Sequence, residues 1–204
     1  METAREEPLS QPKAAFEIVA MAASAGGLNA LSQVLSGLPA QFPAAIVIVQ
    51  HLDPRHRSLM ADILSRRTVL KVKQADEKDS LQPGMVYIAP PNRHLLVNSD
   101  GTLSLTQSEL VHFVRPSADL LFDSVAASYQ NRAIAVVLSG TGNDGGMGVQ
   151  AIKQMGGTVI AQDEATSEFF GMPSTAIQTG TVDFILPLPE IAAALATLVM
   201  QRDT

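Results

Sequence analysis

The chain has 204 residues, of which 46% are hydrophobic and 4% aromatic, enough apolar side chain for the core of one sizeable α/β domain. Its net charge of −6 and its lack of a basic run argue against nucleic acid as a partner, because phosphate binding needs clustered Lys and Arg. The absence of cysteine excludes disulfides, thiol catalysis and thiolate metal sites, and fits a cytoplasmic location. No apolar stretch reaches the roughly 18–20 residues of a membrane span, so we expect no membrane insertion.

Apolar runs and helical periodicities alternate along the chain. Residues 1–15 are polar and charge-mixed, without the apolar core of a signal peptide, and we interpret them as a mobile leader. We predict strands over 16–22, 44–49, 70–75, 85–89, 133–138, 158–161 and 182–186, of which 44–49 and 133–138 are buried. We predict helices over 28–38, 59–66, 116–129, 149–155, 174–178 and 189–201. This alternation predicts an α/β fold in residues 16–204, with a doubly wound, mostly parallel sheet flanked by helices.

The middle of the chain interrupts this alternation. Leu95–Val97 and Thr102–Leu105 flank Asn98-Ser99-Asp100-Gly101, and Asp-Gly between two apolar runs is a strong hairpin signal. We therefore expect an antiparallel hairpin insertion near 85–107.

Three polar residues follow predicted strands. Ser24 comes after the first strand, His51 after the second, and Asp144 lies in the glycine loop after 133–138. Functional groups of a doubly wound sheet gather at the carboxyl ends of its strands. A serine hydroxyl becomes a nucleophile when a base takes its proton and an acid orients that base. These positions therefore predict a Ser-His-Asp triad.

Each of these residues also has a structural interpretation. Ser24 fits the N-cap of the 28–38 helix, His51 a hydrogen-bonded histidine at a strand end, and Asp144 an Asx-type turn. The order Ser, His, Asp differs from that of the α/β-hydrolases, and Ala22 replaces the first glycine of their nucleophile elbow. From the spacing alone, both interpretations stay open.

A dinucleotide-binding loop is an alternative. Gly140–Gly145 fits G-x-G-x-x-G between a strand and a helix, and Asp163 stands where an acid would bind the ribose. The match falls late in the chain, and Asp144 would place a carboxylate against the pyrophosphate. A metal site at His51, Asp53 and His56 is a weaker alternative, because the two histidines are five residues apart rather than four.

Polar side chains also surround Pro90-Pro91, namely those of Tyr87, Asn92, Arg93 and His94. They fit either a solvated loop or a rim that receives a substrate. Arg115, before Pro116, fits either a salt bridge or a substrate contact.

Six segments, taken in order, resemble the catalytic domain of the bacterial chemoreceptor protein-glutamate methylesterases (CheB-type). The likeness covers about residues 16–200. It rests on the blocks Ala23-Ser24-Ala25-Gly26-Gly27, Val49-Gln50-His51-Leu52-Asp53-Pro54, Pro83-Gly84-Met85-Val86-Tyr87-Ile88-Ala89-Pro90, Arg115-Pro116-Ser117-Ala118-Asp119, Leu138-Ser139-Gly140-Thr141-Gly142-Asn143-Asp144-Gly145 and Phe170-Gly171-Met172-Pro173.

The resemblance implies a function and roles for individual residues. Ser24 would be the nucleophile, His51 the general base and Asp144 the orienting acid of an enzyme that hydrolyses glutamate γ-methyl esters on chemoreceptors or receptor-like signalling proteins. The same acyl-enzyme route would deamidate glutamines, with no metal or organic cofactor. The implied oxyanion and substrate contacts come from Ala25, Gly26, Thr141 and Met172.

The chain departs from the family pattern at Ala23, Ala25 and Thr141, where well-studied members have glycine, threonine and methionine. These variants resemble the methylesterase domains fused to methyltransferase and sensor-kinase modules. About 15 residues precede the first predicted strand, too few for the family's receiver domain, so we expect signalling partners in trans. A catalytically weak relative that serves protein interaction or regulation is the other functional hypothesis.

Overall fold

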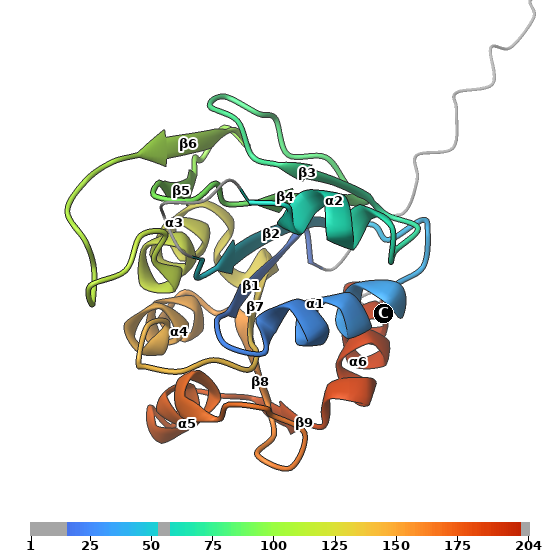
Figure 1. The fold of residues 1–204 in the computed structure, drawn as a ribbon, viewed down its shortest axis with the longest axis vertical. Helices are drawn as coiled ribbons and strands as arrows, with labels where there is room; N and C mark the ends of the chain where they lie inside the picture. Colours follow the sequence, from blue (N-terminus) through green and yellow to red (C-terminus); the bar gives the residue numbers. More distant parts are fainter. Residues whose placement is uncertain (1–15, 53–57, 201–204) are drawn as a thin grey trace, which may run out of the picture.

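The computed structural model describes residues 16–52 and 58–200, so the predicted leader at 1–15 lies outside the described residues. The main sheet contains β1 (Ile18–Ala23), β2 (Ala45–Gln50), β3 (Lys71–Gln74), β4 (Met85–Ile88), β7 (Ala133–Val137), β8 (Thr158–Gln162) and β9 (Phe184–Leu186). Its seven strands are all parallel, in the order β3-β4-β2-β1-β7-β8-β9 (Figure 1). The predicted α/β class is confirmed.

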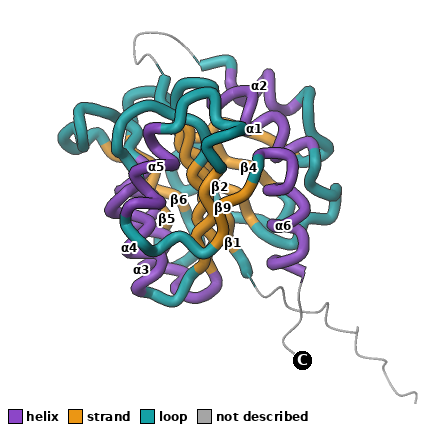
Figure 2. Tube along the Cα trace, turned by 90° about the horizontal axis from the view of Figure 1, so that it is seen from below, coloured by secondary structure: helices purple, strands orange, loops and turns teal. Residues whose placement is uncertain are grey.

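Helices cover both faces of this sheet, as Figure 2 shows edge-on. One face carries α1 (Gly27–Ser36), α2 (Met60–Ser65) and α6 (Leu188–Met200). The other carries α3 (Ala118–Tyr129), α4 (Gly146–Gln154) and α5 (Gly171–Gln178), and a 3₁₀ turn at Gln130–Arg132 follows α3. Each face has its own buried apolar cluster, which is why the central strands are apolar on both sides.

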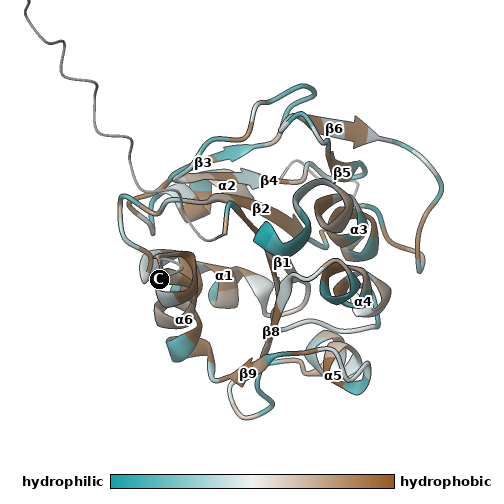
Figure 3. Cartoon of the chain, turned by 180° about the vertical axis from the view of Figure 1, so that it is seen from behind, coloured by the Kyte–Doolittle hydropathy of each residue, from teal (hydrophilic) through white to brown (hydrophobic). Residues whose placement is uncertain are grey.

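Strand composition follows position in the sheet. Every residue of the central strands β1, β2 and β7 is buried, and these strands are almost continuous apolar runs. The edge strand β3 has the sequence Lys-Val-Lys-Gln with exposed ends and is hydrophilic in Figure 3. Charged side chains on an edge strand discourage pairing with another chain.

The predicted hairpin forms a separate antiparallel pair, β5 (His94–Val97) and β6 (Leu103–Thr106). It packs on α3, where Ser124 Oγ accepts a hydrogen bond from the amide of Val97 at 2.9 Å. The insertion is shorter than the expected 85–107, because β4 pairs in parallel with β2 and belongs to the main sheet.

Two helices begin three residues earlier than predicted. In α4 the extra turn includes Gly148, where a Cβ would lie 2.6 Å from Phe122 Cβ, so this glycine allows α4 to approach α3 closely. In α5 the extra turn includes Pro173, which fits the first turn of a helix because the amide there needs no helical partner.

The strand order changes direction between β1 and β7. From β1 the chain builds the sheet toward β2, β4 and β3, whereas from β7 it builds toward β8 and β9. Loops at such a switch point separate at the carboxyl ends of the strands and leave room for a ligand. The loops after β1, β2 and β7 carry the three predicted triad residues.

Candidate active site

Ser24 directly follows β1 and is held at the switch point by its backbone. Its amide donates to the carbonyl of Ser139, which follows β7, at 3.0 Å. The predicted N-cap role is wrong, because the N-cap of α1 is Gly26, with φ of 75° and no side-chain cap. Ser24 Oγ has no hydrogen-bond partner among the described residues, and the side chain is partly exposed. Its hydroxyl is therefore available to a reactant.

A hollow of about 420 Å³ opens beside Ser24 at the amino end of α1. Its apolar lining comes from Leu28, Leu52 and Met60, and two charged side chains, Arg67 and Glu168, also face it. The hollow beside Ser24 thus has an apolar wall, one positively charged side chain and one negatively charged side chain.

His51 directly follows β2, next to Ser24. Its amide donates to the carbonyl of Ala23 at 3.1 Å, continuing the register that pairs Ala23 with Gln50. The buried Gln50 side chain ties the two strand ends together, since its Nε2 donates to the carbonyls of Ser24 at 2.8 Å and His51 at 3.0 Å. This role of Gln50 was not predicted from the sequence, although Gln50 directly precedes His51.

Asp144 lies in the glycine loop after β7 and accepts four hydrogen bonds. His51 Nε2 donates to Asp144 Oδ2 at 2.8 Å. Three donors come from the start of α3: Ser117 Oγ at 2.9 Å, the Ala118 amide at 2.6 Å and the Asp119 amide at 3.1 Å. The carboxylate is therefore anchored to a helix amino end, where the backbone amides favour negative charge.

These contacts decide the charge of Asp144, which is 3% exposed. Burial alone would raise the pKa of its carboxyl group, but the hydrogen bond from His51 and the amides of Ala118 and Asp119 outweigh burial and lower the pKa below its usual value. Asp144 is therefore ionised at neutral pH and able to stabilise a protonated His51. An ionised acid paired with a histidine is the orienting part of a triad.

A second buried acid lies beside Asp144 on α3. Burial raises the pKa of Asp119, the amide of Gly148 opposes this rise, and the charge of Asp144 adds to it. Asp119 Oδ1 accepts from the Gly148 amide at 2.7 Å, and Oδ2 accepts from His112 Nε2 at 3.1 Å. Asp119 thus links the start of α3 to α4 and to the loop before α3.

Two members of the predicted polar rim are buried instead. Tyr87 is 2% exposed and donates to the carbonyl of Ser80, and His94 is fully buried. His94 Nδ1 accepts from the Ser117 amide at 3.1 Å while Nε2 donates to the carbonyl of Glu109 at 2.9 Å, and burial lowers its pKa. The rim prediction is therefore wrong for Tyr87 and His94, because Tyr87 packs in the apolar cluster of the α3 face and His94 contacts the start of α3.

Asn92 and Arg115 do border the site. They line a hollow of about 180 Å³ with His51 and Leu52. Arg115 donates to Asn92 Oδ1 from Nε at 3.0 Å and from Nη2 at 2.7 Å, and it forms no ion pair with a carboxylate in the described part of the chain. The Arg115 guanidinium therefore joins the loop of Asn92 to the loop before α3 by hydrogen bonds, and the predicted salt bridge does not form among the described residues.

The predicted oxyanion donors differ in availability. The amides of Ala25, Gly26 and Thr141 have no acceptor among residues 16–52 and 58–200, whereas the Met172 amide donates to the carbonyl of Gly140 at 2.9 Å. Met172 is buried and packs against Gly140, where an added Cβ would lie 2.4 Å from Met172 Sδ and 2.9 Å from Ser24 Cβ. Only glycine fits between these two side chains.

Comparison with known proteins places this arrangement in a family. Residues 19–195 match the family model described as CheB methylesterase. The chain belongs to the CheB methylesterase family. The crystal structure of the Thermotoga maritima CheB methylesterase catalytic domain is similar with a TM-score of 0.87 and 39% sequence identity, over 90% of this chain and 99% of that one.

Two curated CheB-family relatives differ in length. One from Leptospira interrogans is 42% identical over 177 residues, which cover 87% of this chain and 92% of the relative. A protein-glutamate methylesterase/protein-glutamine glutaminase from Moorella thermoacetica is 43% identical over 188 residues, which cover 90% of this chain but 44% of the relative.

The alternative sites gain no support in this CheB-family structure. The carboxylate of Asp144 points to the start of α3, and Asp163 Oδ1 accepts from the amide and the hydroxyl of Thr166, so neither is arranged around a dinucleotide. Two of the three residues of the metal alternative, Asp53 and His56, lie outside the described residues. Within the described part, no helix is long and apolar enough to cross a membrane.

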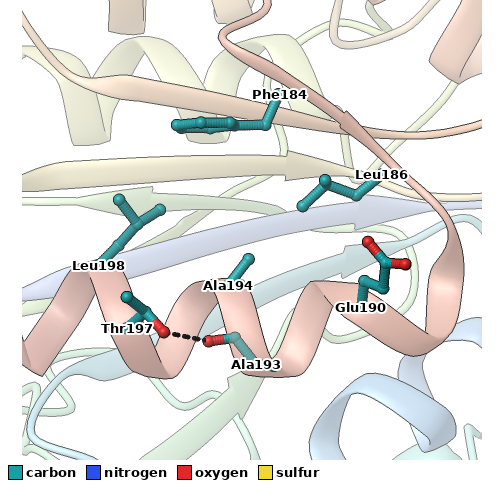
Figure 4. A pocket seen from close by; sticks show the side chains of 7 residues that line it. All are labelled: Phe184, Leu186, Glu190, Ala193, Ala194, Thr197 and Leu198. Atoms are coloured by element: carbon teal, nitrogen blue, oxygen red, sulfur yellow. Dashed lines mark hydrogen bonds between the residues drawn. The ribbon is translucent and has the colours of Figure 1, made fainter.

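A hollow of about 500 Å³ lies away from the triad, between β9 and α6 (Figure 4). Phe184 and Leu186 of β9 face α6 residues Glu190 to Leu198 across it. Glu190 is the one ionisable side chain among its lining residues. Its lining therefore includes no histidine that could activate the Thr197 hydroxyl as a nucleophile.

Proposed function

We propose that this CheB-family chain is a serine hydrolase that cleaves glutamate γ-methyl esters on chemoreceptors or receptor-like signalling proteins and deamidates glutamines by the same route. The observation that carries the proposal is the hydrogen bond from His51 to the ionised, helix-anchored Asp144, at the strand end next to the free hydroxyl of Ser24. This combination is what activation of a serine requires.

The hydrogen bond assigns the two nitrogens of His51. Because Nε2 donates to Asp144, Nδ1 is the nitrogen left to accept the serine proton. Ser24 Oγ attacks the acyl carbon of the ester as His51 Nδ1 takes its proton. The protonated imidazole then gives that proton to the departing oxygen, so methanol leaves and an acyl-serine remains.

Water completes the reaction. His51 Nδ1 takes a proton from the water, whose oxygen attacks the acyl-serine, and then returns the proton to Ser24 Oγ, leaving a glutamate carboxylate. With a glutamine substrate, the first leaving group is ammonia and the remaining steps are the same.

Backbone amides would stabilise the oxyanion in both steps. The unpartnered amides of Ala25 and Gly26 lie at the amino end of α1, and that of Thr141 lies in the loop after β7. Each donor to an oxyanion is worth about 3–4 kcal/mol in other enzymes. Because these donors are main-chain groups, the alanine at 25 and the threonine at 141 leave them in place.

We further propose that the enzyme is cytoplasmic and acts on helical segments of receptors. Any signalling partners would be separate proteins that act in trans. The site would need no metal or organic cofactor, because serine, histidine and aspartate supply the nucleophile, the base and its orienting acid.

Methanol release from a receptor signalling fragment carrying labelled methyl esters tests the proposal. The wild type should release labelled methanol, and Ser24→Ala should reduce kcat by at least about 10⁴-fold, as loss of a triad member does elsewhere. Ser36→Ala is the matched control, because Ser36 is an exposed serine on α1 whose hydroxyl only contacts its own helix.

The outcomes separate the hypotheses. Equal release by wild type and Ser24→Ala would remove Ser24 as the nucleophile. If the wild type binds the fragment but releases no methanol, the interaction-module hypothesis replaces the enzymatic one.

A further inference from the structure

The loop between β6 and α3 carries exposed apolar side chains near the active site. In Figure 1 it swings away from the body of the molecule before it returns to α3, and part of it is hydrophobic in Figure 3. Phe113 is 94% exposed and Leu110 53% exposed. A phenylalanine this exposed contributes almost no burial to the fold, so its side chain is free to contact another molecule.

Residues 110–114, which we call the tip, are held in a defined shape. Val111 and Val114 exchange backbone hydrogen bonds at 3.2 and 2.9 Å, which closes a two-residue turn over His112 and Phe113. Both turn residues have positive φ, 50° and 65°, a conformation usually left to Asn and Gly and unfavourable for a bulky side chain.

Side-chain contacts maintain this costly turn. His112 Nε2 donates to the buried Asp119, and Arg115 Nη1 donates to the carbonyls of Gln107 and Ser108 at 3.2 and 2.7 Å. Strained backbone persists where surrounding contacts over-determine it, and such places are often functional. The tip is therefore preorganised to present Phe113 to the outside.

The tip also shares a hollow with the catalytic base. The hollow of about 180 Å³ is lined by His51 and Asn92 together with Leu110, Phe113 and Val114 of the tip. This volume is below the roughly 300–1,000 Å³ of typical small-molecule pockets, so it suits a single side chain of a larger partner. Because His51 also borders this hollow, the tip lies beside the proposed base of the reaction, within reach of a protein whose ester is at Ser24.

We propose that the tip is the docking contact for the substrate protein: an apolar side chain on the same helix face as the esterified glutamate inserts against Phe113 and Leu110. This inference rests on the proposed function. In a helical substrate, side chains three, four or seven residues from the reacting glutamate share its face. An aromatic anchor beside a side-chain-sized hollow is the usual form of an interface hot spot.

Phe113→Ala tests the inference with two substrates, the methyl-labelled receptor fragment and p-nitrophenyl acetate. We expect kcat/KM for the fragment to fall about 10- to 30-fold, mostly through KM, as for loss of a hot-spot aromatic. Turnover of p-nitrophenyl acetate should stay within twofold of wild type, because Ser24, His51 and Asp144 are untouched. Ile185→Ala on β9 removes another exposed apolar side chain, 52% exposed and on an edge strand of the sheet, and should change neither rate.

Phe113→Gly separates docking from a structural role. Glycine adopts a positive φ without strain, so this variant should unfold at the same or a higher denaturant concentration than wild type while still losing fragment turnover. A residue that only supports the fold would show the opposite pattern. Phe113→Leu, which keeps an apolar side chain, should retain at least a third of wild-type kcat/KM.

Each result decides between the two proposals. Equal fragment turnover by wild type and Phe113→Ala overturns the docking role and leaves the proposed function standing. Parallel losses on both substrates also overturn it, because they show damage to the catalytic groups. If the wild type hydrolyses p-nitrophenyl acetate but not the receptor ester, the proposed function fails, and the docking role fails with it.

Discussion

Removing the Ser117 hydroxyl should weaken both catalysis and the fold, through Asp144. Ser117 Oγ donates to Asp144 Oδ1 at 2.9 Å and accepts from the Leu120 amide at 3.4 Å as the N-cap of α3. A hydrogen bond to a charged group is worth about 1.5–3 kcal/mol, and a long cap bond adds about 0.5 kcal/mol. Ser117→Ala should therefore lower the unfolding free energy by about 2–3 kcal/mol.

The expected loss of activity is smaller than for a triad member. Three donors to Asp144 remain in Ser117→Ala, so the carboxylate stays ionised but is held less firmly against His51. We expect kcat to fall about tenfold, equivalent to about 1.4 kcal/mol, on the receptor ester and on a small ester alike. Purified variants would be compared by steady-state turnover and by denaturant unfolding.

The same variant should shift acid unfolding. Because the folded pKa of Asp144 lies below the usual value of 3.8, its ionised form adds stability above that value, and this stability is lost as the pH falls through the folded pKa. Removing a donor to the ionised form raises the folded pKa toward 3.8, so Ser117→Ala should lose less stability on acidification. Because the variant is already less stable at neutral pH, it should still unfold at a higher pH than wild type. Circular dichroism between about pH 2 and pH 5 would measure the shift.

Ser124→Ala provides the control. Ser124 is on the same helix, and its hydroxyl accepts from Val97 and donates to Leu121 without contacting Asp144. It should cost about 1 kcal/mol of stability with unchanged kcat. A Ser117→Ala enzyme with wild-type kcat and an unshifted acid-unfolding midpoint would refute a role for Ser117 in holding Asp144.

Two further variants examine the acid and the glycine loop. Asp144→Asn should reduce kcat on a small ester by about 10⁴-fold. An amide NH₂ facing His51 Nε2 favours the tautomer that carries its proton on Nδ1, which cannot accept the serine proton. A kcat within tenfold of wild type would contradict this role of Asp144. Gly140→Ala should lower kcat at least tenfold and cost about 1–3 kcal/mol, because its Cβ would push on Ser24 and Met172. Gly37→Ala is the control: its Cβ would crowd Ala192 on α6, so this variant should lose stability but keep its activity. Equal kcat values for the two glycine variants would argue against a role for Gly140 in positioning Ser24.

The sequence was enough to predict an element where one physical signal dominated. Continuous apolar runs identified β1, β2 and β7, because a strand buried on both faces has few other possible compositions. Alternation of strands and helices then predicted the parallel sheet, and the position of polar residues after strands predicted that Ser24, His51 and Asp144 would meet at one edge. The hydrogen bond between His51 and Asp144 agrees with that expectation.

Other features depended on tertiary contacts with no local signal. Ser24 matched an N-cap by type, but the turn at Gly26 places two residues between it and α1. Tyr87 and His94 looked solvated, yet the fold covers both and supplies their partners. Ser117 lay near the start of the predicted 116–129 helix, whereas its hydrogen bond to Asp144, 27 residues away, exists only because the β7 loop meets the start of α3.

The start of α3 connects the chemistry of this enzyme to its stability. Asp144 and Asp119 are both buried there, and the charge of one raises the pKa of the other, so placing them together has a cost. Backbone amides offset that cost, because Ala118 and Asp119 donate to Asp144 while Gly148 donates to Asp119. The two acids then hold separate histidines: Asp144 holds His51, the proposed base, and Asp119 holds His112 in the tip. A single helix amino end thus fixes the proposed base and the proposed docking contact relative to each other. A protein substrate needs this if its ester is to reach Ser24 while its neighbouring side chain contacts Phe113.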